Sequence, residues 1–192
     1  MTLKRTIDPL LQPVSLATLQ AHVRREPGED DVFLQHCLDV AVGQFDGDDG
    51  ELGRALITQT WEETYAVVPA PGGAVELTLA PVSALAKVEV YTSAESWEEI
   101  AVAEAELFED AGRYLVAADW LRPGKHRAPL RITYVAGYGE EATSVPPQII
   151  HAILLFAAHL YEVREPVSFE GTPVEVPLSI ARLVANHKTW WR

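Results

Sequence analysis

The spacing of hydrophobic residues changes twice along this chain, from a helical period to a strand period and back. Near the start, Ser15 is placed to cap a helix that continues to about Arg25, and a proline-glycine pair follows it. A second helix is predicted over residues 30–45, because apolar residues recur there at intervals of three and four. The two segments are expected to form a helical hairpin.

The middle of the chain has the two-residue period of half-buried strands. Within residues 58–65, the side chains of Trp61, Glu63 and Tyr65 are expected on one face. Further strands are predicted over residues 75–79, 85–91, 97–102 and 130–135, with a hairpin around residues 110–112. Prolines and glycines separate these segments, which predicts a small, mostly antiparallel β unit.

The helical period returns after two consecutive prolines. Over residues 149–161 only His151 and His159 interrupt an apolar run, so this helix has more apolar surface than one neighbour covers. It is expected at the centre of a bundle or at a contact between subunits. A last helix is predicted from residue 178 to about residue 188.

These segments together predict an α+β fold: a helical bundle built from N- and C-terminal helix pairs, with an inserted and mostly antiparallel β unit. The bundle is expected to comprise residues 1–55 and 137–192, and the inserted β unit residues 56–136. If the two parts fold separately, replacing the insertion with a short Gly-Ser linker should leave a soluble helical protein.

Composition narrows the range of functions. The chain has 192 residues, 48% of them hydrophobic, enough for one domain or a core with one insertion. Its formal charge of -13 would repel a nucleic-acid backbone, so DNA binding over a wide surface is not expected. The single cysteine, Cys37, excludes an internal disulfide. No apolar run reaches the ~20 residues of a membrane span and the start lacks a signal peptide, so we expect a soluble protein made in the cytoplasm.

Two segments group side chains in a way that suggests a metal site. The acidic turn of residues 46–51 lacks the glycine and glutamate positions of a calcium loop and is interpreted as a solvent-exposed loop. On the long helix, His159 and Glu162 are near enough to share an ion if other segments supply ligands, whereas His151 lies about 12 Å of helix away from His159. The alternative interpretation is that these side chains form the only face of the helix that meets solvent or polar neighbours.

No segment carries a local catalytic or cofactor motif. Gly137 and Gly139 follow a strand and precede a helix, but neither a dinucleotide fingerprint nor a glycine-rich lysine loop surrounds them. No serine lies in a G-x-S-x-G elbow. A catalytic serine triad would therefore have to be assembled from distant segments of the chain. Local motifs therefore give no support for catalysis, a cofactor or a metal site.

The C-terminal segment, residues 178–192, differs in charge from the rest of the chain. It contains no acidic residue, although the whole protein is acidic. Either its tryptophans cover the bundle of their own subunit or they anchor a partner protein. The candidate partner-binding residues are its basic and aromatic side chains: Arg182, His187, Lys188, Trp190, Trp191 and Arg192.

Several stretches resemble one family when they are taken in order. They are PVSLATLQAHVR, GRALITQTWEETY, LTLAPVSALAKVEVY, RITYVAGYG and VPPQIIHAILLFAAHLYEVRE, followed by a short final helix. This order resembles the head-tail connector (adaptor) proteins of long-tailed bacteriophages, prophages and gene transfer agents. The resemblance covers nearly the whole chain.

The resemblance implies a structural, non-enzymatic component of the virion at the head-tail interface, assembled in the host cytoplasm. It implies a ring of about twelve copies beneath the portal protein. Such a ring continues the DNA channel, lets DNA pass without sequence-specific binding, and joins the head to a stopper or tail-completion protein, with no membrane involved. The alternatives are a metal-dependent enzyme using His159 and Glu162, and a monomeric small-molecule binding module using the β unit.

If the C-terminal segment docks on the portal protein, a deletion of residues 187–192 is expected to leave the melting behaviour nearly unchanged. Assembly should then stop at heads without tails.

Overall fold

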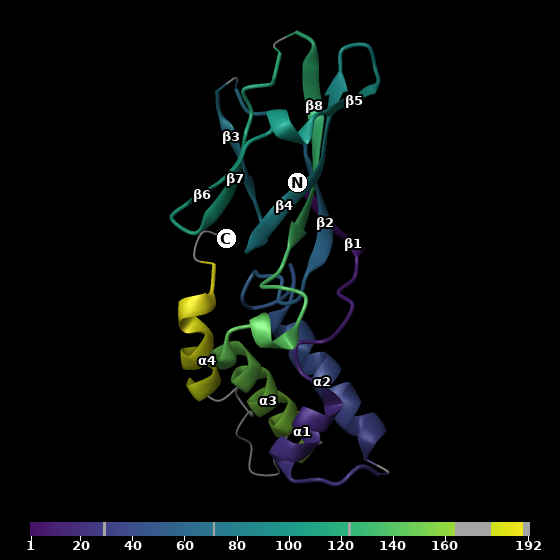
Figure 1. Cartoon of the computed structure of the whole chain (residues 1–192), viewed down its shortest axis with the longest axis vertical. Helices are drawn as coiled ribbons and strands as arrows, with labels where there is room; N and C mark the ends of the chain where they lie inside the picture. Colours follow the sequence, from purple (N-terminus) through teal and green to yellow (C-terminus); the bar gives the residue numbers. More distant parts are fainter. Residues whose placement is uncertain (29, 71, 123, 164–177, 190–192) are drawn as a thin grey trace, which may run out of the picture. The chain divides into compact units, whose positions relative to one another are not determined.

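The computed structural model describes residues 1–28, 30–70, 72–122, 124–163 and 178–189. The chain divides into two compact units, each made from two separate stretches of sequence (Figure 1). Unit 1 comprises Met1–Leu10 and Thr58–Tyr138, and unit 2 comprises Leu11–Ile57 and Gly139–Arg192. The β-sheets belong to unit 1 and the α-helices to unit 2, which confirms the prediction of an α+β fold with antiparallel sheets.

Unit 1 is built from two antiparallel sheets. The larger has the strand order β1-β2-β8-β4-β5 and the smaller the order β3-β7-β6. A short 3-10 helix, η1 (Val102–Glu104), lies between β5 and β6. The strands are β1 (Thr2–Ile7), β2 (Gln59–Tyr65), β3 (Ala74–Leu77), β4 (Val82–Thr92), β5 (Trp97–Ile100), β6 (Leu107–Asp110), β7 (Arg113–Ala117) and β8 (His126–Ala136).

Strand β8 shows how the two-residue period builds the core of unit 1. Leu130, Ile132 and Tyr134 have no exposed surface, whereas the residues between them are half-buried. Ile132 pairs with Val88 of β4, and Tyr134 pairs with Trp61 of β2. Because β8 has a strand on each side, its inward side chains are covered from both directions.

Glu63 of β2 lies in this core although it is an acidic residue, and it has no exposed surface. The hydroxyl groups of Tyr65 and Tyr134 donate hydrogen bonds to its carboxylate, and the backbone N–H of Thr78 donates a third at 2.8 Å. The hydroxyl of Tyr134 also accepts a bond of 3.3 Å from the N–H of Leu79. A buried carboxylate needs such partners, and here they connect β2 and β8 to the segment after β3.

The first strand corrects the sequence analysis, which assigned residues 1–55 to the helical part. Thr2–Ile7 forms β1, and β1 pairs antiparallel with β2, so Met1–Leu10 belong to unit 1. The guanidinium of Arg5 lies over the ring of Trp61, 4.8 Å from its centroid. An edge strand has only one neighbour, so a short and largely polar sequence forms it without a strong hydrophobic signal.

Unit 2 has four α-helices in the part of the chain that the structure describes. Ser15 caps the first as the sequence predicts, because its hydroxyl accepts a 3.1 Å bond from the N–H of Thr18. Two short 3-10 helices, η2 (Ala142–Ser144) and η3 (Ala185–His187), flank the C-terminal helices. The α-helices are α1 (Leu16–Val23), α2 (Asp31–Phe45), α3 (Pro147–Glu162) and α4 (Leu178–Val184).

Helix α3 has the most neighbours in unit 2, since it contacts α1, α2 and α4. Its buried side chains include Ile149, Ile153 and Phe156, and the ring of Phe156 meets that of Phe45 at the end of α2. At the other end of α2, the hydroxyl of Tyr161 donates a 2.8 Å bond to the carboxylate of Asp30. The apolar run of residues 149–161 therefore lies between helices of its own subunit, one of the two places predicted for it.

Candidate partner interface

The C-terminal segment begins with α4, which packs against α3. Ile180 and Val184 are buried, and Arg182 between them is exposed. This spacing gives the short helix one face toward unit 2 and one face toward solvent. Arg182 therefore lies on the solvent-exposed face of α4.

The residues after α4 are bonded to the loop between α2 and β2. Both the N–H and the hydroxyl of Thr189 donate to the carbonyl of Leu52, each at 3.1 Å. The guanidinium of Arg54 donates to the carbonyl of His187. Lys188 forms an ion pair with Glu51, so an acid of the same chain already compensates its charge.

The loop that receives these bonds is well structured and only partly exposed as predicted, because Asp49 and Glu51 are exposed whereas Gly47 is buried. The carboxylate of Asp46 accepts a 2.8 Å bond from the N–H of Leu56, and the N–H of Gly47 donates at 2.7 Å to the carbonyl of Arg54. Gly50 is buried, and a Cβ atom there would lie 2.7 Å from the carbonyl oxygen of Asp46. The glycines of this acidic turn allow two stretches of its backbone to pack closely against each other.

Two basic residues, His187 and Arg54, lie next to each other at this contact. Burial, followed by the nearby positive charge of Arg54, lowers the pKa of His187. His187 is therefore biased toward its neutral form, and its carbonyl rather than its ring makes the contact with Arg54.

The partners of the C-terminal segment cannot be read from the sequence. Leu52 and Thr189 are 137 residues apart, and no local pattern connects segments at that distance. Trp190, Trp191 and Arg192 lie outside the described residues.

The metal candidates on α3 do not come together with other ligands. His151 is exposed and meets the ring of His22 edge-on, with the centroids 6.1 Å apart. His159 is half-buried and Glu162 is exposed. Among the residues that the structure describes, no three histidine, cysteine, aspartate or glutamate side chains are grouped to hold a metal ion.

An open groove of about 960 Å³ lies in unit 2, at the start of α3. It is lined mainly by apolar side chains, including Leu11, Val14, Val145, Ile150 and Leu154, with His151 among its polar residues. The alternative of a small-molecule module placed its site in the β unit, whereas this groove belongs to the helical unit. Within the described ranges, no helix is both long enough and apolar enough to cross a bilayer.

Comparison with known proteins gives matches at the level of structure. No protein-family model and no curated protein matches the sequence. The fold is similar to a chain of the "Virion of native gene transfer agent (GTA) particle", with a TM-score of 0.77 and 22% identity. It is also similar to chains of the "Neck of empty GTA particle computed with C6 symmetry" (TM-score 0.75, 21% identity) and the "Neck of native GTA particle computed with C12 symmetry" (TM-score 0.74, 21% identity).

Each of these matches covers 98% of this chain and 96% of the other. At such identities the likeness establishes a shared fold. The fold is thus one that occurs in gene transfer agent particles, a class of particle that the sequence resemblance also names.

Proposed function

We propose that this protein is a structural component of the neck of a phage-related particle and acts there as the head-tail adaptor. The observation that carries the proposal is the likeness of fold to chains of gene transfer agent particles, which extends over nearly the whole length of both proteins. The order of the sequence motifs supports the same family. In this role the protein is a non-enzymatic part of the virion, assembled in the host cytoplasm.

In the proposed arrangement, about twelve copies form a closed head-to-tail ring beneath the portal protein. Two of the similar chains belong to necks computed with C6 and with C12 symmetry, and a ring of twelve copies is compatible with both. The ring continues the DNA channel and meets a stopper or tail-completion protein on its other side. The net charge of -13 suits a channel through which DNA slides, because a strongly basic lining would retain the phosphate backbone.

The C-terminal segment is proposed to dock on the portal protein. Arg182 supports this role because it is exposed on α4 and suits an acidic partner surface. Lys188 contributes less than the sequence alone suggests, since it pairs with Glu51. The docking therefore depends on Arg182 and on the aromatic and basic residues Trp190, Trp191 and Arg192.

The adaptor role is tested on particles from cells that encode this chain. Electron cryomicroscopy is expected to show a ring of this protein between portal and tail, and deletion of its gene should give heads that lack tails. A neck in which this protein is absent would end the proposal.

The docking role has its own test, in which Arg182→Glu and a deletion of residues 190–192 are compared with Arg24→Glu. Arg24 is an exposed basic residue at the end of α1, which makes it a matched control for charge reversal. The first two variants should fold normally but accumulate heads without tails, whereas the control should assemble. Normal tail attachment in both docking variants would show that the segment does not contact the portal protein.

A further inference from the structure

Unit 1 has sheet edges that no other strand covers within the described part of the chain. β1 ends the five-stranded sheet on one side, and β6 ends the three-stranded sheet. The outward N–H and C=O groups of an edge strand are available to pair with a strand of another chain. Because β3 and β5 are edges too, exposure alone does not select which edges meet.

Charge distinguishes β1 from the other edges. Lys4 lies in the middle of this strand and is exposed, and no other described residue forms an ion pair or hydrogen bond with its side chain. Arg5 follows it directly in the sequence. The guanidinium of Arg5 lies over Trp61 and 3.7 Å from Asp8, so Lys4 is the basic side chain that this edge offers to another chain, on a protein of net charge -13.

The hairpin of β6 and β7 has the opposite charge. Glu109 and Asp110 are exposed, and so is Phe108, whose exposed fraction is 38%. Asp110 pairs with Arg113 at 2.7 Å, whereas Glu109 has no partner in the portion that the structure describes. This edge therefore offers an uncompensated carboxylate next to an exposed aromatic ring.

The acids of β5 are less suited to receive Lys4, although β5 is also an edge. Glu98 pairs with Lys125 at 2.6 Å, and Glu99 lies 3.5 Å from Lys87. A new cation at β5 would have to compete with these lysines, whereas at Glu109 it would meet a free acid. Charge complementarity thus favours β6 as the partner of β1.

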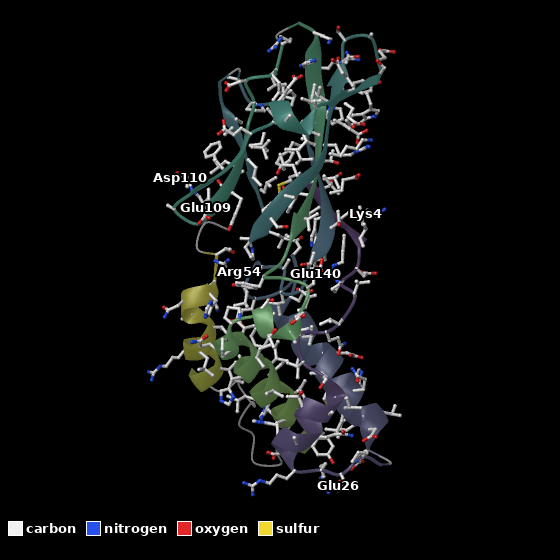
Figure 2. The ribbon with its side chains drawn as sticks, in the orientation of Figure 1. Lys4, Glu26, Arg54, Glu109, Asp110 and Glu140 are labelled. Carbon is white, nitrogen blue, oxygen red and sulfur yellow. The ribbon has the colours of Figure 1, made fainter. Side chains whose placement is uncertain are left out.

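The two edges face away from each other in the molecule. Figure 2 shows Lys4 on one side of unit 1, and Glu109 and Asp110 on the opposite side. One copy cannot join its own edges, but each copy presents one positive and one negative edge. A contact between two different surfaces of identical copies is heterologous. Such contacts close into a ring when a whole number of the rotations between neighbours makes a full turn.

We infer that the β1 edge of one copy pairs with the β6 edge of the next copy, with Lys4 opposite Glu109 and Leu3 opposite Phe108. The pairing is parallel, because only a parallel register gives both the ion pair and the apolar pair. The occupant of each edge is a second copy of this chain. This contact rests on the proposed ring function and specifies which surfaces build the ring.

Disulfide crosslinking in assembled particles tests the contact. Residues paired across neighbouring strands come near enough for a disulfide, so the variant Lys4→Cys/Glu109→Cys should give a ladder of linked copies on a non-reducing gel. The native Cys37 is buried and stays in place. Each single variant serves as a control and should give no ladder.

Two failures are distinguishable in the same particles. If microscopy shows the ring but no ladder forms, the edge contact is wrong and the adaptor role stands. If neither ring nor ladder is found, the adaptor role itself fails.

Charge reversal tests the ion pair separately. Lys4→Glu and Glu109→Lys should each lower ring occupancy about tenfold, because like charges then face each other across the contact. The double variant Lys4→Glu/Glu109→Lys should restore it. Arg127→Glu, at an exposed site that faces Glu95, is the matched control and should have little effect. Absence of rescue in the double variant would overturn the Lys4–Glu109 pairing.

Discussion

Glu63 connects three segments of unit 1 through its carboxylate. Its donors are the hydroxyl groups of Tyr65 and Tyr134 and the N–H of Thr78, and it has no exposed surface. In such a site the penalty for removing one hydrogen-bonding partner exceeds the usual net value of one bond, because the group left behind stays buried and unsatisfied. The cluster is therefore a point of high sensitivity in the β-sheets.

Tyr134→Phe is expected to lower the free energy of unfolding by about 1–3 kcal/mol. The variant keeps the ring but removes a donor to Glu63 and an acceptor for Leu79. Urea unfolding followed by circular dichroism measures the loss. Tyr91→Phe is the control, because the Tyr91 hydroxyl makes no hydrogen bond to any described residue. Equal losses in the two variants would show that the hydroxyl of Tyr134 does not matter.

The same cluster predicts a loss of stability in alkali. Burial, and next the negative charge of Glu63, raise the pKa of Tyr65 and of Tyr134 above the ordinary value of 10.0. Above about pH 10 the unfolded chain has released these protons and the folded chain has not, so unfolding becomes more favourable as the pH rises. Below that pH the contribution of both tyrosines is fully present.

Unfolding free energies measured between about pH 8 and about pH 11 should therefore fall more steeply for the native protein than for Tyr65→Phe/Tyr134→Phe. The double variant has no phenol at either position, so it serves as the reference for all other groups that titrate there. If the unfolding free energies of the two proteins fall equally with pH, the loss of stability does not come from Tyr65 and Tyr134.

At the scale of elements, the sequence predicts most of unit 1 and unit 2 because their periods are clean. Alternation in residues 130–135 and the three- and four-residue spacing in residues 30–45 correspond to β8 and α2. The sequence does not reveal β1, since an edge strand needs no continuous hydrophobic face. It also does not reveal the contact of Thr189 with Leu52, because that contact depends on how distant segments pack.

Thr189→Ala is expected to lower the free energy of unfolding by about 1 kcal/mol. The substitution removes the bond from the hydroxyl to Leu52 but keeps the one from the backbone N–H. Asn186→Ala, at an exposed neighbouring position, is the control. Thermal unfolding and hydrogen exchange of the α4 amides measure both variants.

The contacts of Lys188 and Thr189 also bear on the expectation that removing residues 187–192 leaves stability unchanged. We now expect that deletion to destabilise unit 2, and α4 amides that exchange at the native rate after it would contradict this. A deletion of residues 190–192 keeps these contacts and is the cleaner probe of partner binding.

At the scale of the whole molecule, each unit is expected to fold without the other. The test variant lacks residues 1–10 and 58–138 and joins residues 57 and 139 by a short Gly-Ser linker. It should retain helical circular dichroism and unfold cooperatively, because α1, α2, α3 and α4 pack within unit 2. A variant that keeps residues 1–10 should have the same helix content but aggregate more readily, since β1 then has no partner. Complete loss of helix in the first variant would show that both units share one core.

The division of both units into two stretches also sets the order in which the protein folds during synthesis. Residues 1–10 leave the ribosome before β2, and the helices α1 and α2, which contact each other, leave it before α3. Unit 1 can close when residue 138 has emerged, whereas the apolar side of α2, including Leu34 and Leu38, waits for α3. At ordinary elongation rates that wait lasts roughly 5 to 25 seconds. The length of the β segment therefore sets how long the apolar side of the nascent α1–α2 pair stays uncovered, a period in which a bound chaperone would keep it apart from other nascent copies.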